Sequence, residues 1–525
     1  MINRITMKKT IYLLAALLLL SVNFSCKKFL NVEPLSKLSG NNYWKTEGDA
    51  EGFALGMYRS FREATMQSVL FEIGDTRCGW AIPSSKGYPP RIDFTYMATN
   101  NLKMAIAARA DRSLPGYEAN AINEWFQLNS RYDLIQKWAP FYKVIQSANI
   151  MVKEVAAMPD GALSPAKKKQ YIAEAVFMRC VSYFFLVRLF GDVPYYTEAY
   201  NQDALPRTNM VKVLKSCLED LGAVKNDLPW TYNDPTFKGI RAMRGGAIDL
   251  MMHMNMWCAG FDAGNAPAYY TQVDELGNEL QDIGVDQQKA YRLMPIEQTY
   301  LIMFGKSQEG LFEIQLSDNT GENTAKLRYK YSFSVVHNPF FASSDRPVSE
   351  LVYNADFMKK IYPESGTDKR KTVWFDENIY DQTGVWQFYK FYNRAALVQF
   401  SDDNPIIFRL ADAILLHAEA LAELGRDGEA ATLLNVIRAR AGADLYPANP
   451  GEGKIKDAIF LERAKELMGE GHHFYDLVRT RKILDPKFTP NPLSFSAFQA
   501  GAWTWPIDPS ATINNPYMTL NNYWR

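Results

Sequence analysis

The chain has 525 residues, and its 58 basic and 58 acidic side chains leave a formal net charge of zero. A balanced charge gives no electrostatic reason for nucleic-acid binding, so we expect no nucleic-acid partner. The hydrophobic fraction of 47% suits a packed globular protein. Aromatic residues reach 13% of the chain, a share high enough that we expect some of them to have a use beyond packing.

The first 25 residues have the order of a bacterial secretory signal. The basic residues Arg4, Lys8 and Lys9 come before the apolar run 11–20, and small polar residues follow it. This apolar run is shorter than the roughly 20 residues of a membrane-spanning helix. We therefore expect residues 1–25 to be a cleaved signal peptide.

Cys26 comes directly after this signal. Ser25-Cys26 resembles the end of a lipobox, in which the cysteine is lipidated and becomes the new N-terminus, although Asn23 and Phe24 depart from the strict pattern. We expect Cys26 to carry acyl chains such as palmitate that hold the protein at the membrane, with plain secretion as the alternative. Residues 26–40 are polar and contain proline, and we expect them to be a tether.

Four cysteines remain beyond Cys26, but their spacing suggests neither a disulfide framework nor a zinc site. Cys180, Cys217 and Cys258 fall in helical patterns, and we expect each to be a buried free thiol. The sequence leaves the disulfide state of these cysteines and of Cys78 open. The packed core, rather than cross-links, is therefore expected to hold the fold.

Five segments before residue 260 have apolar residues at the helical spacing of three and four. Ser164 and Pro165 suit the N-cap and first position of a helix, and Gly191 suits its end. The predicted helices cover residues 47–62, 137–152, 164–190, 207–228 and 239–259. We interpret them as degenerate tetratricopeptide-like helix pairs, although the strict repeat signature is absent.

Two regions interrupt the helical pattern. Residues 69–131 and 261–405 contain many turn-forming residues, so we expect loops in both. In the second region Phe312, Ile314 and Leu316 alternate with polar residues, which predicts a short half-buried strand. Because an insertion of this length is often functional, we expect residues 261–405 to be a loop-rich binding region.

The helical pattern resumes in the last part of the chain, with predicted helices over residues 406–424, 429–441 and 455–469. The first helix should pack Leu410, Ile414 and Leu421 against the second, because these three residues share one helical face. The helical scaffold is thus predicted to span residues 41–260 and 406–482.

No catalytic or metal-binding motif stands out. His472 and His473 are neighbours whose side chains would diverge on a helix, so they could hardly share one metal ion. His417 lies on an apolar face and is expected to be a hydrogen-bonded core residue. Five charged residues have spacings that fit ion pairs: Arg438, Arg440, Glu462, Arg463 and Glu466. We expect no enzyme activity and no cofactor, and we assign no metal site; the sequence leaves open whether a structural metal is present.

Six phrases of the chain resemble, in the same order, the SusD/RagB family of surface lipoproteins from Bacteroidetes-type bacteria. They are CKKFLNVEP, YWKTEGDAEGFALGMYRSF, YIAEAVFMRCVSYFFLVRLFGDVPYY, RLADAILLHAEALAELG, ERAKELMGEGHHFYDLVR and WPIDPSATINNPYMTLNNYW. These phrases are spread in the right order across almost the whole mature chain, which makes the resemblance specific. One departure is His472-His473, where relatives more often carry one bulky or basic residue.

The resemblance implies a mostly α-helical fold, with tetratricopeptide-like pairs as the scaffold of a single domain over residues 41–525 and short strands in its irregular region. It also implies a nutrient-binding lipoprotein of the bacterial outer membrane that faces the cell surface. Such a protein captures oligosaccharides for a TonB-dependent SusC-like barrel. Peptide capture is the alternative, and a glycan-processing enzyme and a helical scaffold that binds only protein remain as rival classes.

Ligand-binding residues of the family tend to come from the early loops and from the loops after the central helices. A sugar needs a flat aromatic surface for its C–H face and planar polar groups for its hydroxyls. The early candidates are Asp75, Arg77, Trp80, Tyr88, Tyr96, Asn100 and Asn101, and the later ones are Tyr269, Tyr270, Tyr331 and Trp374. The alternative for Trp80, the expected platform, is that it caps a helix pair and never meets solvent.

Overall fold

The computed structural model describes most of the chain after the N-terminal segment. The described residues are 43–66, 73–77, 79–83, 92–110, 132–282, 290–316, 351–376, 378–381, 386–391, 404–448, 452–513 and 515–525. The predicted signal peptide, the tether and Cys26 lie outside the described residues, as do Cys78, Tyr88 and Tyr331.

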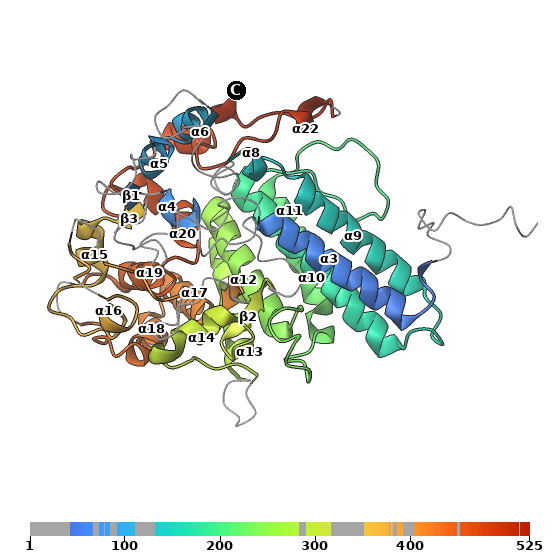
Figure 1. The fold of residues 1–525 in the computed structure, drawn as a ribbon, viewed down its shortest axis with the longest axis horizontal. Coiled ribbons are helices and arrows are strands. Elements are labelled where there is room, and N and C mark those ends of the chain that lie inside the picture. The colour runs from blue at the N-terminus through green and yellow to red at the C-terminus, as the bar shows by residue number, and fades with distance from the viewer. Residues whose placement is uncertain are drawn as a thin grey trace, which may run out of the picture.

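A row of packed helices forms the scaffold. α3 (Glu47–Thr65), α9 (Ala139–Ala157), α10 (Pro165–Phe190) and α11 (Met210–Val224) lie side by side in one half of the molecule (Figure 1). Each of these helices packs against the next in that order. Because consecutive helix packing is the arrangement of helical repeats, the predicted mostly α-helical, tetratricopeptide-like fold is confirmed.

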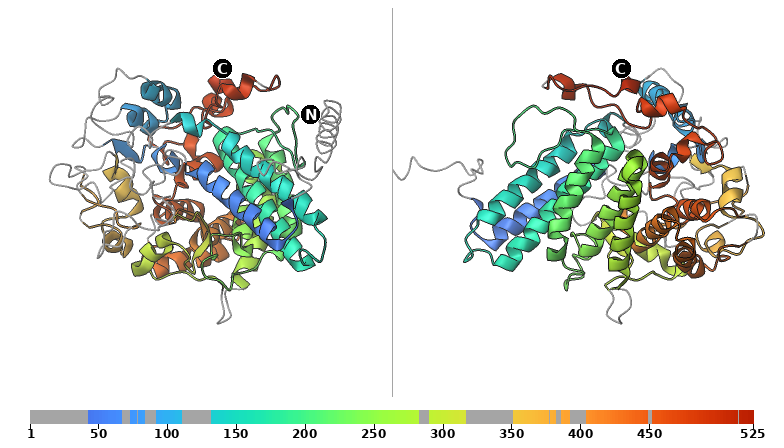
Figure 2. Two further views of the ribbon diagram at one scale, coloured as in Figure 1. Left: turned by 45° about the vertical axis from the view of Figure 1, so that its right-hand side comes forward. Right: turned by 180° about the vertical axis from the view of Figure 1, so that it is seen from behind.

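The row continues through the middle of the molecule into its other half. α12 (Arg244–Phe261) packs against both α11 and α13 (Ala266–Asp282), and α13 packs against α17 (Leu410–Glu423). α18 (Asp427–Arg440) and α19 (Ile455–Glu466) then pack against α17. The two predicted scaffold segments are therefore continuous in space through α13, and Figure 2 shows this succession from two further sides.

α13 corrects the prediction that residues 261–405 are loops from their start. Its buried residues Tyr269, Val273, Leu276 and Leu280 recur at spacings of four, three and four, which is a helical pattern. The proline near its start does not break the helix, because a proline in the first turn interrupts no hydrogen bond within the helix. Glycine and proline, read as loop signals, hid this periodicity in the sequence.

His417 of α17 is a hydrogen-bonded core residue, as predicted. Its side chain is 3% exposed, and its Nε2 lies 2.8 Å from Oδ1 of Asp274 in α13. Gly277 brings the two helices together at this point, since a Cβ on that residue would lie 2.4 Å from the His417 ring. A close helix crossing and one hydrogen bond thus fix α13 against α17.

α10 begins and ends where the sequence predicts. The Ser164 hydroxyl accepts a hydrogen bond from the backbone N–H of Lys167 at 3.3 Å, and Pro165 is the first helical residue. Gly191 ends the helix with a φ of 74°, a left-handed conformation that favours glycine. The helix between them is buried on nearly all sides in its second half.

The predicted apolar face of α17 is also confirmed. Leu410, Ile414 and Leu421 are all buried, as are Leu434 and Ile437 of α18, and the two helices pack against each other. Burial of these five side chains removes apolar surface from water, and each Å² removed stabilises the folded state by roughly 25 cal/mol. This contact therefore stabilises the second half of the scaffold.

The three described cysteines are buried free thiols, as expected for helical cysteines in this chain. Cys180 and Cys217 lie together, with the Cys180 thiol donating to the carbonyl oxygen of Cys217 at 3.6 Å. Cys258 is buried separately in α12. No disulfide therefore links the described part of the chain.

Short helices connect and cover the scaffold. They are α4 (Ile73–Thr76), α5 (Ile92–Ala98), α6 (Leu102–Ala110), α8 (Tyr132–Ile135), α14 (Thr299–Phe304), α15 (Ala355–Ile361), α16 (Arg370–Val373), α20 (His473–Arg479), α21 (Phe495–Gln499) and α22 (Ser510–Ile513). The prediction of loops over residues 69–131 is wrong where α4, α5 and α6 lie. Single-turn 3-10 helices cover Lys225–Asp227, Ala263–Asn265, Ile296–Gln298, Lys482–Leu484 and Asn522–Trp524.

Two antiparallel strand pairs join distant segments. β1 (Ala81–Pro83) pairs with β3 (Leu351–Tyr353), and β2 (Gly310–Glu313) pairs with β4 (Ile406–Arg409). The predicted strand is confirmed at Phe312, but β2 ends before Ile314 and Leu316, and all four of its residues are buried instead of every second one. β4 occupies the start of the predicted helix 406–424, which in the structure begins at the residue after the strand.

Glu313 explains why the polar position of β2 is buried. Its backbone N–H donates to the carbonyl oxygen of Gly239 at 2.9 Å, and its carboxylate accepts from the backbone N–H of Lys306. A buried polar group is tolerated when its hydrogen bonds are made within the protein. The alternation of polar and apolar residues therefore predicted a solvent-facing side that this strand does not have.

Buried ion pairs connect the helices of the second half. Glu466 of α19 is fully buried and accepts hydrogen bonds from Arg370 at 2.9 Å, from Arg409 at 2.8 Å and from Arg440. Burial alone would raise the pKa of Glu466, but the three guanidinium groups hold it well below its usual value. The interpretation of these charged residues as ion pairs is confirmed.

The same network includes the carboxylate one helical turn earlier. Glu462 accepts from Arg370 at 2.6 Å and from Arg438 at 3.0 Å. Despite its burial, these arginines and Lys465 lower the pKa of Glu462 to about 2. Both glutamates are therefore ionised and paired inside the protein at neutral pH.

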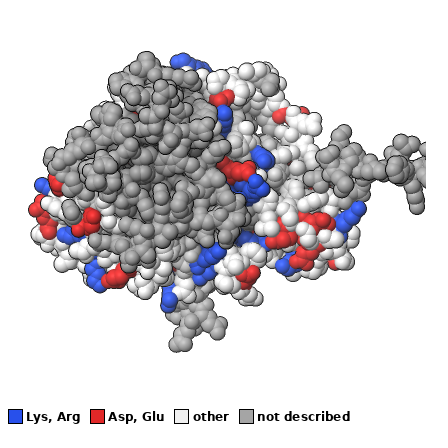
Figure 3. Space-filling view, in the orientation of Figure 1, with Lys and Arg blue, Asp and Glu red and all other residues white. Residues whose placement is uncertain are grey.

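Charges on the described surface are mixed. On the face shown in Figure 3, basic and acidic side chains lie among each other, and neither sign forms a continuous field over the described part. This mixing agrees with the zero net charge of the sequence. Among the helices of the described residues, none combines the length and apolar character needed to cross a membrane.

We expect Glu466→Gln to lower the free energy of unfolding by about 3–5 kcal/mol, because a neutral amide leaves three buried guanidinium groups without their shared carboxylate. Urea unfolding at neutral pH measures this change. Glu63→Gln is the control, since Glu63 pairs with Arg59 on an exposed face of α3 and such pairs contribute little. Equal unfolding midpoints for the two variants would contradict the role of the buried network.

Candidate functional site

Two of the early candidates, Arg77 and Asn100, lie inside the protein. Arg77 is 1% exposed and donates to the carbonyl oxygens of Trp503 at 2.8 Å and Ala502 at 3.0 Å, and to Oδ1 of Asn100 at 3.1 Å. Its guanidinium also lies over the Phe474 ring, 4.2 Å from the centroid. In this structure Arg77 joins the early segment to the C-terminal segment and presents no surface to a ligand.

Asp75 is buried beside Arg77. Its carboxylate accepts from the backbone N–H of Gly471 at 2.8 Å, and burial raises its pKa to about 7. Gly74 allows this contact, because a Cβ there would lie 1.9 Å from the carbonyl oxygen of Gly471. These residues hold α4 against the turn that precedes α20.

Trp80, the expected platform, is 8% exposed. Its ring stacks on Phe357 of α15, with the centroids 4.1 Å apart and the planes inclined by 28°. His473 lies on the same cluster, 5.9 Å from the Trp80 ring. The structure thus places Trp80 in the core, as in the alternative for this residue, because a flat ring on a short loop can be covered by a distant helix.

Two early candidates remain at the surface. Tyr96 in α5 is half-buried, and Asn101 is exposed at the start of α6, where its Oδ1 accepts from the backbone N–H of Met104 at 3.3 Å. Lys103 of α6 lies over the Tyr523 ring, 4.5 Å from its centroid. α6 therefore borders the C-terminal segment.

The later candidates are also part of the scaffold. Tyr269 is 5% exposed and Tyr270 half-buried, both on α13, and the Tyr269 hydroxyl donates to Asp262 at 2.7 Å. Trp374 is 1% exposed, and the Lys390 ammonium lies 4.7 Å from its ring centroid. A ligand-binding role for the candidate residues as a set stays a prediction, and the buried members offer no open face here.

We expect Trp80→Ala to lower the free energy of unfolding by about 3–5 kcal/mol, because it removes a large buried side chain. Trp80→Phe is the matched control, since it keeps an aromatic ring on Phe357 and should retain most of the stability. Urea unfolding measures both variants. Unchanged stability of Trp80→Ala would instead show that the ring is free to meet a ligand.

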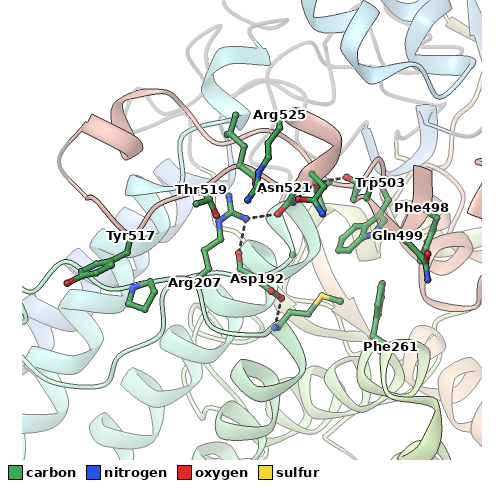
Figure 4. A pocket seen from close by; sticks show the side chains of 18 of the residues that line it. Asp192, Arg207, Phe261, Phe498, Gln499, Trp503, Tyr517, Thr519, Asn521 and Arg525 are labelled. Carbon is green, nitrogen blue, oxygen red and sulfur yellow. Dashed lines mark hydrogen bonds between the residues drawn. The ribbon is translucent and has the colours of Figure 1, made fainter. Parts of the chain in front are cut away.

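An open cavity of about 670 Å³ lies beside the C-terminal segment (Figure 4). Its walls come from the end of α10, the start of α11, the end of α12, α21 and the last residues of the chain. The lining residues that define this pocket chemically are Asp192, Arg207, Phe261, Arg481, Phe498, Gln499, Trp503, Asn521 and Arg525. We call this cavity the C-terminal pocket.

Arg481 places a positively charged side chain in the lining of the C-terminal pocket. Its guanidinium lies against the stacked pair of Phe261 and Phe498, 4.4 and 4.3 Å from their ring centroids, and donates to the carbonyl oxygen of Gly260 at 2.7 Å. Stacking of this kind fixes a guanidinium plane and retains its charge. Arg481 has a φ of 62°, a left-handed conformation that is uncommon for a non-glycine residue and is often found at functional positions.

Arg207 and Asn521 hold the opposite wall. Arg207 donates to the carbonyl oxygens of Phe190 at 3.3 Å and Asp192 at 3.1 Å, and to Oδ1 of Asn521 at 2.9 Å, as Figure 4 shows for the last two residues. Asn521 in turn donates to the carbonyl oxygen of Phe190 at 3.1 Å and to the Thr504 hydroxyl at 2.8 Å. These bonds fasten the terminal segment to the end of α10.

The rim of the C-terminal pocket presents exposed polar side chains to a ligand. Gln499, Thr519, Asn522 and Arg525 line the cavity with exposed side chains. Together with the aromatic wall they provide donors, acceptors and flat apolar surface, which suit a small polar ligand such as a sugar. Sequence reasoning missed this site because its walls lie up to 334 positions apart, from Gly191 to Arg525.

A second cavity of about 480 Å³ lies between α15, α18 and α19. Its charged groups already pair with one another or with the backbone: Arg438 with Glu462, and Lys371 with the carbonyl oxygens of Pro363 and Gly366. Because its charged side chains are already paired within the protein, this cavity is less suited to ligand capture than the C-terminal pocket.

Two family profiles match the sequence. The profile described as the SusD family matches residues 376–524, and the profile described as starch-binding associating with outer membrane matches residues 93–242. The C-terminal pocket takes walls from both matched segments.

Known proteins resemble the chain over most of its length. SusD-like protein P38 of Formosa agariphila is 25% identical over 542 residues, a match that covers 96% of this chain and 97% of that protein. A SusD-like protein of Bacteroides ovatus is 39% identical over 391 residues, covering 67% of this chain and 66% of that protein.

Solved structures show the same likeness. A SusD homolog from Bacteroides thetaiotaomicron is 38% identical, with a TM-score of 0.77, and the match covers 92% of this chain and all of that one. A laminarin-binding SusD-like protein is 19% identical, with a TM-score of 0.63, and covers 90% of this chain and 98% of that one. At that identity the second likeness concerns the fold alone.

Proposed function

The chain belongs to the SusD/RagB family, and on that premise we propose that it captures oligosaccharides at the cell surface for uptake through a TonB-dependent SusC-like transporter. The observation that carries this proposal is the 38% identity to a solved SusD homolog along the whole of that structure. Members of the family are carbohydrate-binding nutrient-uptake proteins rather than enzymes, and they generally pair with SusC-like transporters. The glycan itself is left open by this premise.

The chemistry of the C-terminal pocket supports binding over catalysis. Hydrolysis of a glycosidic bond usually needs two carboxyl groups that flank it. Among the described lining residues the one acidic side chain is Asp192, and its Oδ1 accepts from the backbone N–H of Met210 at 2.9 Å. The stacked Arg481 and the amide-rich rim can hold a sugar, but this lining supplies no acid–base pair to cleave it.

We place the glycan in the C-terminal pocket. We expect the double variant Gln499→Ala, Arg525→Ala to weaken glycan binding about tenfold, because it removes polar partners at the rim worth roughly 1.4 kcal/mol. A glycan array with the leaderless protein identifies the ligand, and titration calorimetry then measures the dissociation constant. Both side chains are exposed, so the melting temperature should not change.

Phe495→Ala is the matched control for that measurement. Phe495 lies on α21 with Gln499 but is 64% exposed and does not line the pocket. Loss of binding in the double variant with intact binding in the control supports the pocket. Equal binding in all variants would move the site elsewhere on the molecule, and a wild-type protein that binds no glycan on the array would refute the function.

We propose further that the protein is held in the outer membrane by lipid on Cys26. Family members are associated with the outer membrane at the cell surface, and the order of the leader supports cleavage before Cys26. We expect Cys26→Ala to release the protein from the membrane fraction, because several acyl chains anchor stably and none remains in the variant. Fractionation of cells and mass spectrometry of the mature N-terminus measure the outcome.

The control for the anchor is Ser36→Ala, a substitution in the polar tether that leaves the cysteine in place. A Cys26→Ala protein that stays with the membrane, together with a wild type that carries no lipid mass, would contradict the anchor. Solubilising the wild-type membrane in mild detergent then tests the transporter partner. Recovery of the protein only as a monomer would count against the pairing.

A further inference from the structure

Three side chains that bind metals well meet in the core between α12, α17 and the start of α20. His253 Nε2 lies 2.7 Å from Asp412 Oδ2, and His472 Nδ1 lies 3.8 Å from the same oxygen. One ligand atom from each of the three residues lies within 4.8 Å of the others. Their exposed fractions are 5%, 0% and 7%, so the cluster is closed to solvent.

Asp249 is a second and independent observation at this place. It lies one helical turn before His253 on α12, on the same face of the helix. Asp249 is 0% exposed, and neither of its carboxylate oxygens has a hydrogen-bond partner among the described residues. A carboxylate in this position needs either a proton or a cation.

Arg463 and Arg479 are bonded to other carboxylates and do not neutralise Asp249. Arg463 bonds to Asp412 at 2.6 Å and to Asp476 at 2.9 Å, and Arg479 bonds to Asp476 and Glu419, each at 2.8 Å. Half-buried Arg188 also acts on His253, and its guanidinium lies 4.4 Å from the Tyr475 ring centroid. Three arginines therefore face four carboxylates when Asp249 is ionised.

Arg409, the other arginine that acts on Asp249, is already engaged. Its guanidinium bonds to the carboxylates of Glu309, Glu466 and Glu470. It therefore has three other carboxylates to neutralise, and neither oxygen of Asp249 has a hydrogen-bond partner among the described residues.

We propose that Asp249, His253, Asp412 and His472 form a buried structural site for one divalent transition-metal ion of the zinc class. Two imidazoles and two carboxylates are a ligand set that zinc accepts in tetrahedral geometry. Bonds of about 2.1 Å place tetrahedral ligand atoms roughly 3.4 Å apart, between the 2.7 and 3.8 Å separations observed at Asp412 Oδ2. Small side-chain movements therefore suffice for His253, Asp412 and His472, whereas Asp249 lies outside this closely spaced group and would have to turn toward it.

The surroundings suit such an ion. Both imidazoles lie in the core, His253 5% and His472 7% exposed, and a neutral ring nitrogen is the form of histidine that binds metal. Arg463 on the other oxygen of Asp412 orients that carboxylate. Binding moves the proton on His253 Nε2 to its other nitrogen and releases any proton held by Asp249.

The bound ion would tie three scaffold elements together. α12 contributes Asp249 and His253, α17 contributes Asp412, and the turn before α20 contributes His472. Because the site is closed, the ion enters as the chain folds and adds to the free energy of folding. The role of the site is thus structural.

The test is the metal content of leaderless protein purified through a cleavable tag without histidine. After growth with added zinc and dialysis against metal-free buffer, inductively coupled plasma mass spectrometry should find about one zinc ion per chain. Asp249→Asn and His472→Gln should each lower this content about tenfold or more. His473→Phe is the matched control and should keep the zinc, because His473 is buried at the adjacent position but lies among Trp80, Phe357 and Phe460.

A second measurement uses the wild type alone, so that misfolding of a variant cannot hide the answer. Protein refolded with Co²⁺ should show the visible absorption of tetrahedral Co²⁺ and melt at a higher temperature than protein refolded in chelator. Less than about a tenth of an ion per chain, with no such spectrum, would overturn the proposal and leave Asp249 neutralised by a proton. Undiminished zinc in both ligand variants would overturn it equally.

Discussion

The carboxylate of Glu466 imposes a strict condition on the second half of the molecule. A buried charge is tolerated only when its partners are placed well enough to replace water, and Glu466 takes its partners from α16, β4 and α18. These elements are distant in sequence, so the ion pairs fix how they meet. Apolar packing of α17 against α18 and α19 stabilises the fold. The ion pairs of Glu466 add specificity, because they can all form in only one arrangement of these elements.

The same logic extends to the edge of the scaffold. Arg77 bonds to the backbone of Trp503 and Ala502, and Arg207 bonds to Asn521. Through these contacts the last part of the chain lies along α4 and the end of α10 instead of moving freely. The C-terminal pocket is a consequence, because buried Arg77 and half-buried Arg207 hold its walls in place through backbone and side-chain oxygens.

The proposed metal site and the ion-pair network occupy neighbouring parts of one core. Arg463 bonds to Asp412 within the proposed site and to Asp476 in the middle of α20. Most carboxylates of this core bond to an arginine, whereas Asp249 has no hydrogen-bond partner among the described residues. A cation at Asp249 would complete the pattern that the other carboxylates already follow.

The sequence by itself determined most of the long scaffold helices and both ends of α10, because these depend on neighbours along the chain. Ser164, Pro165 and Gly191 fix the ends of α10 by local hydrogen bonding and backbone preference, and the apolar spacing of α17 gave its buried face. Burial of Arg77 and Trp80, the strand that replaces the start of a helix at residue 406, and the pocket walls were decided only by the tertiary structure. Polar and aromatic side chains on a short segment suit a ligand or a distant part of the same chain equally well, since both offer the same hydrogen bonds and flat surfaces, and only the folded chain shows which partner is present.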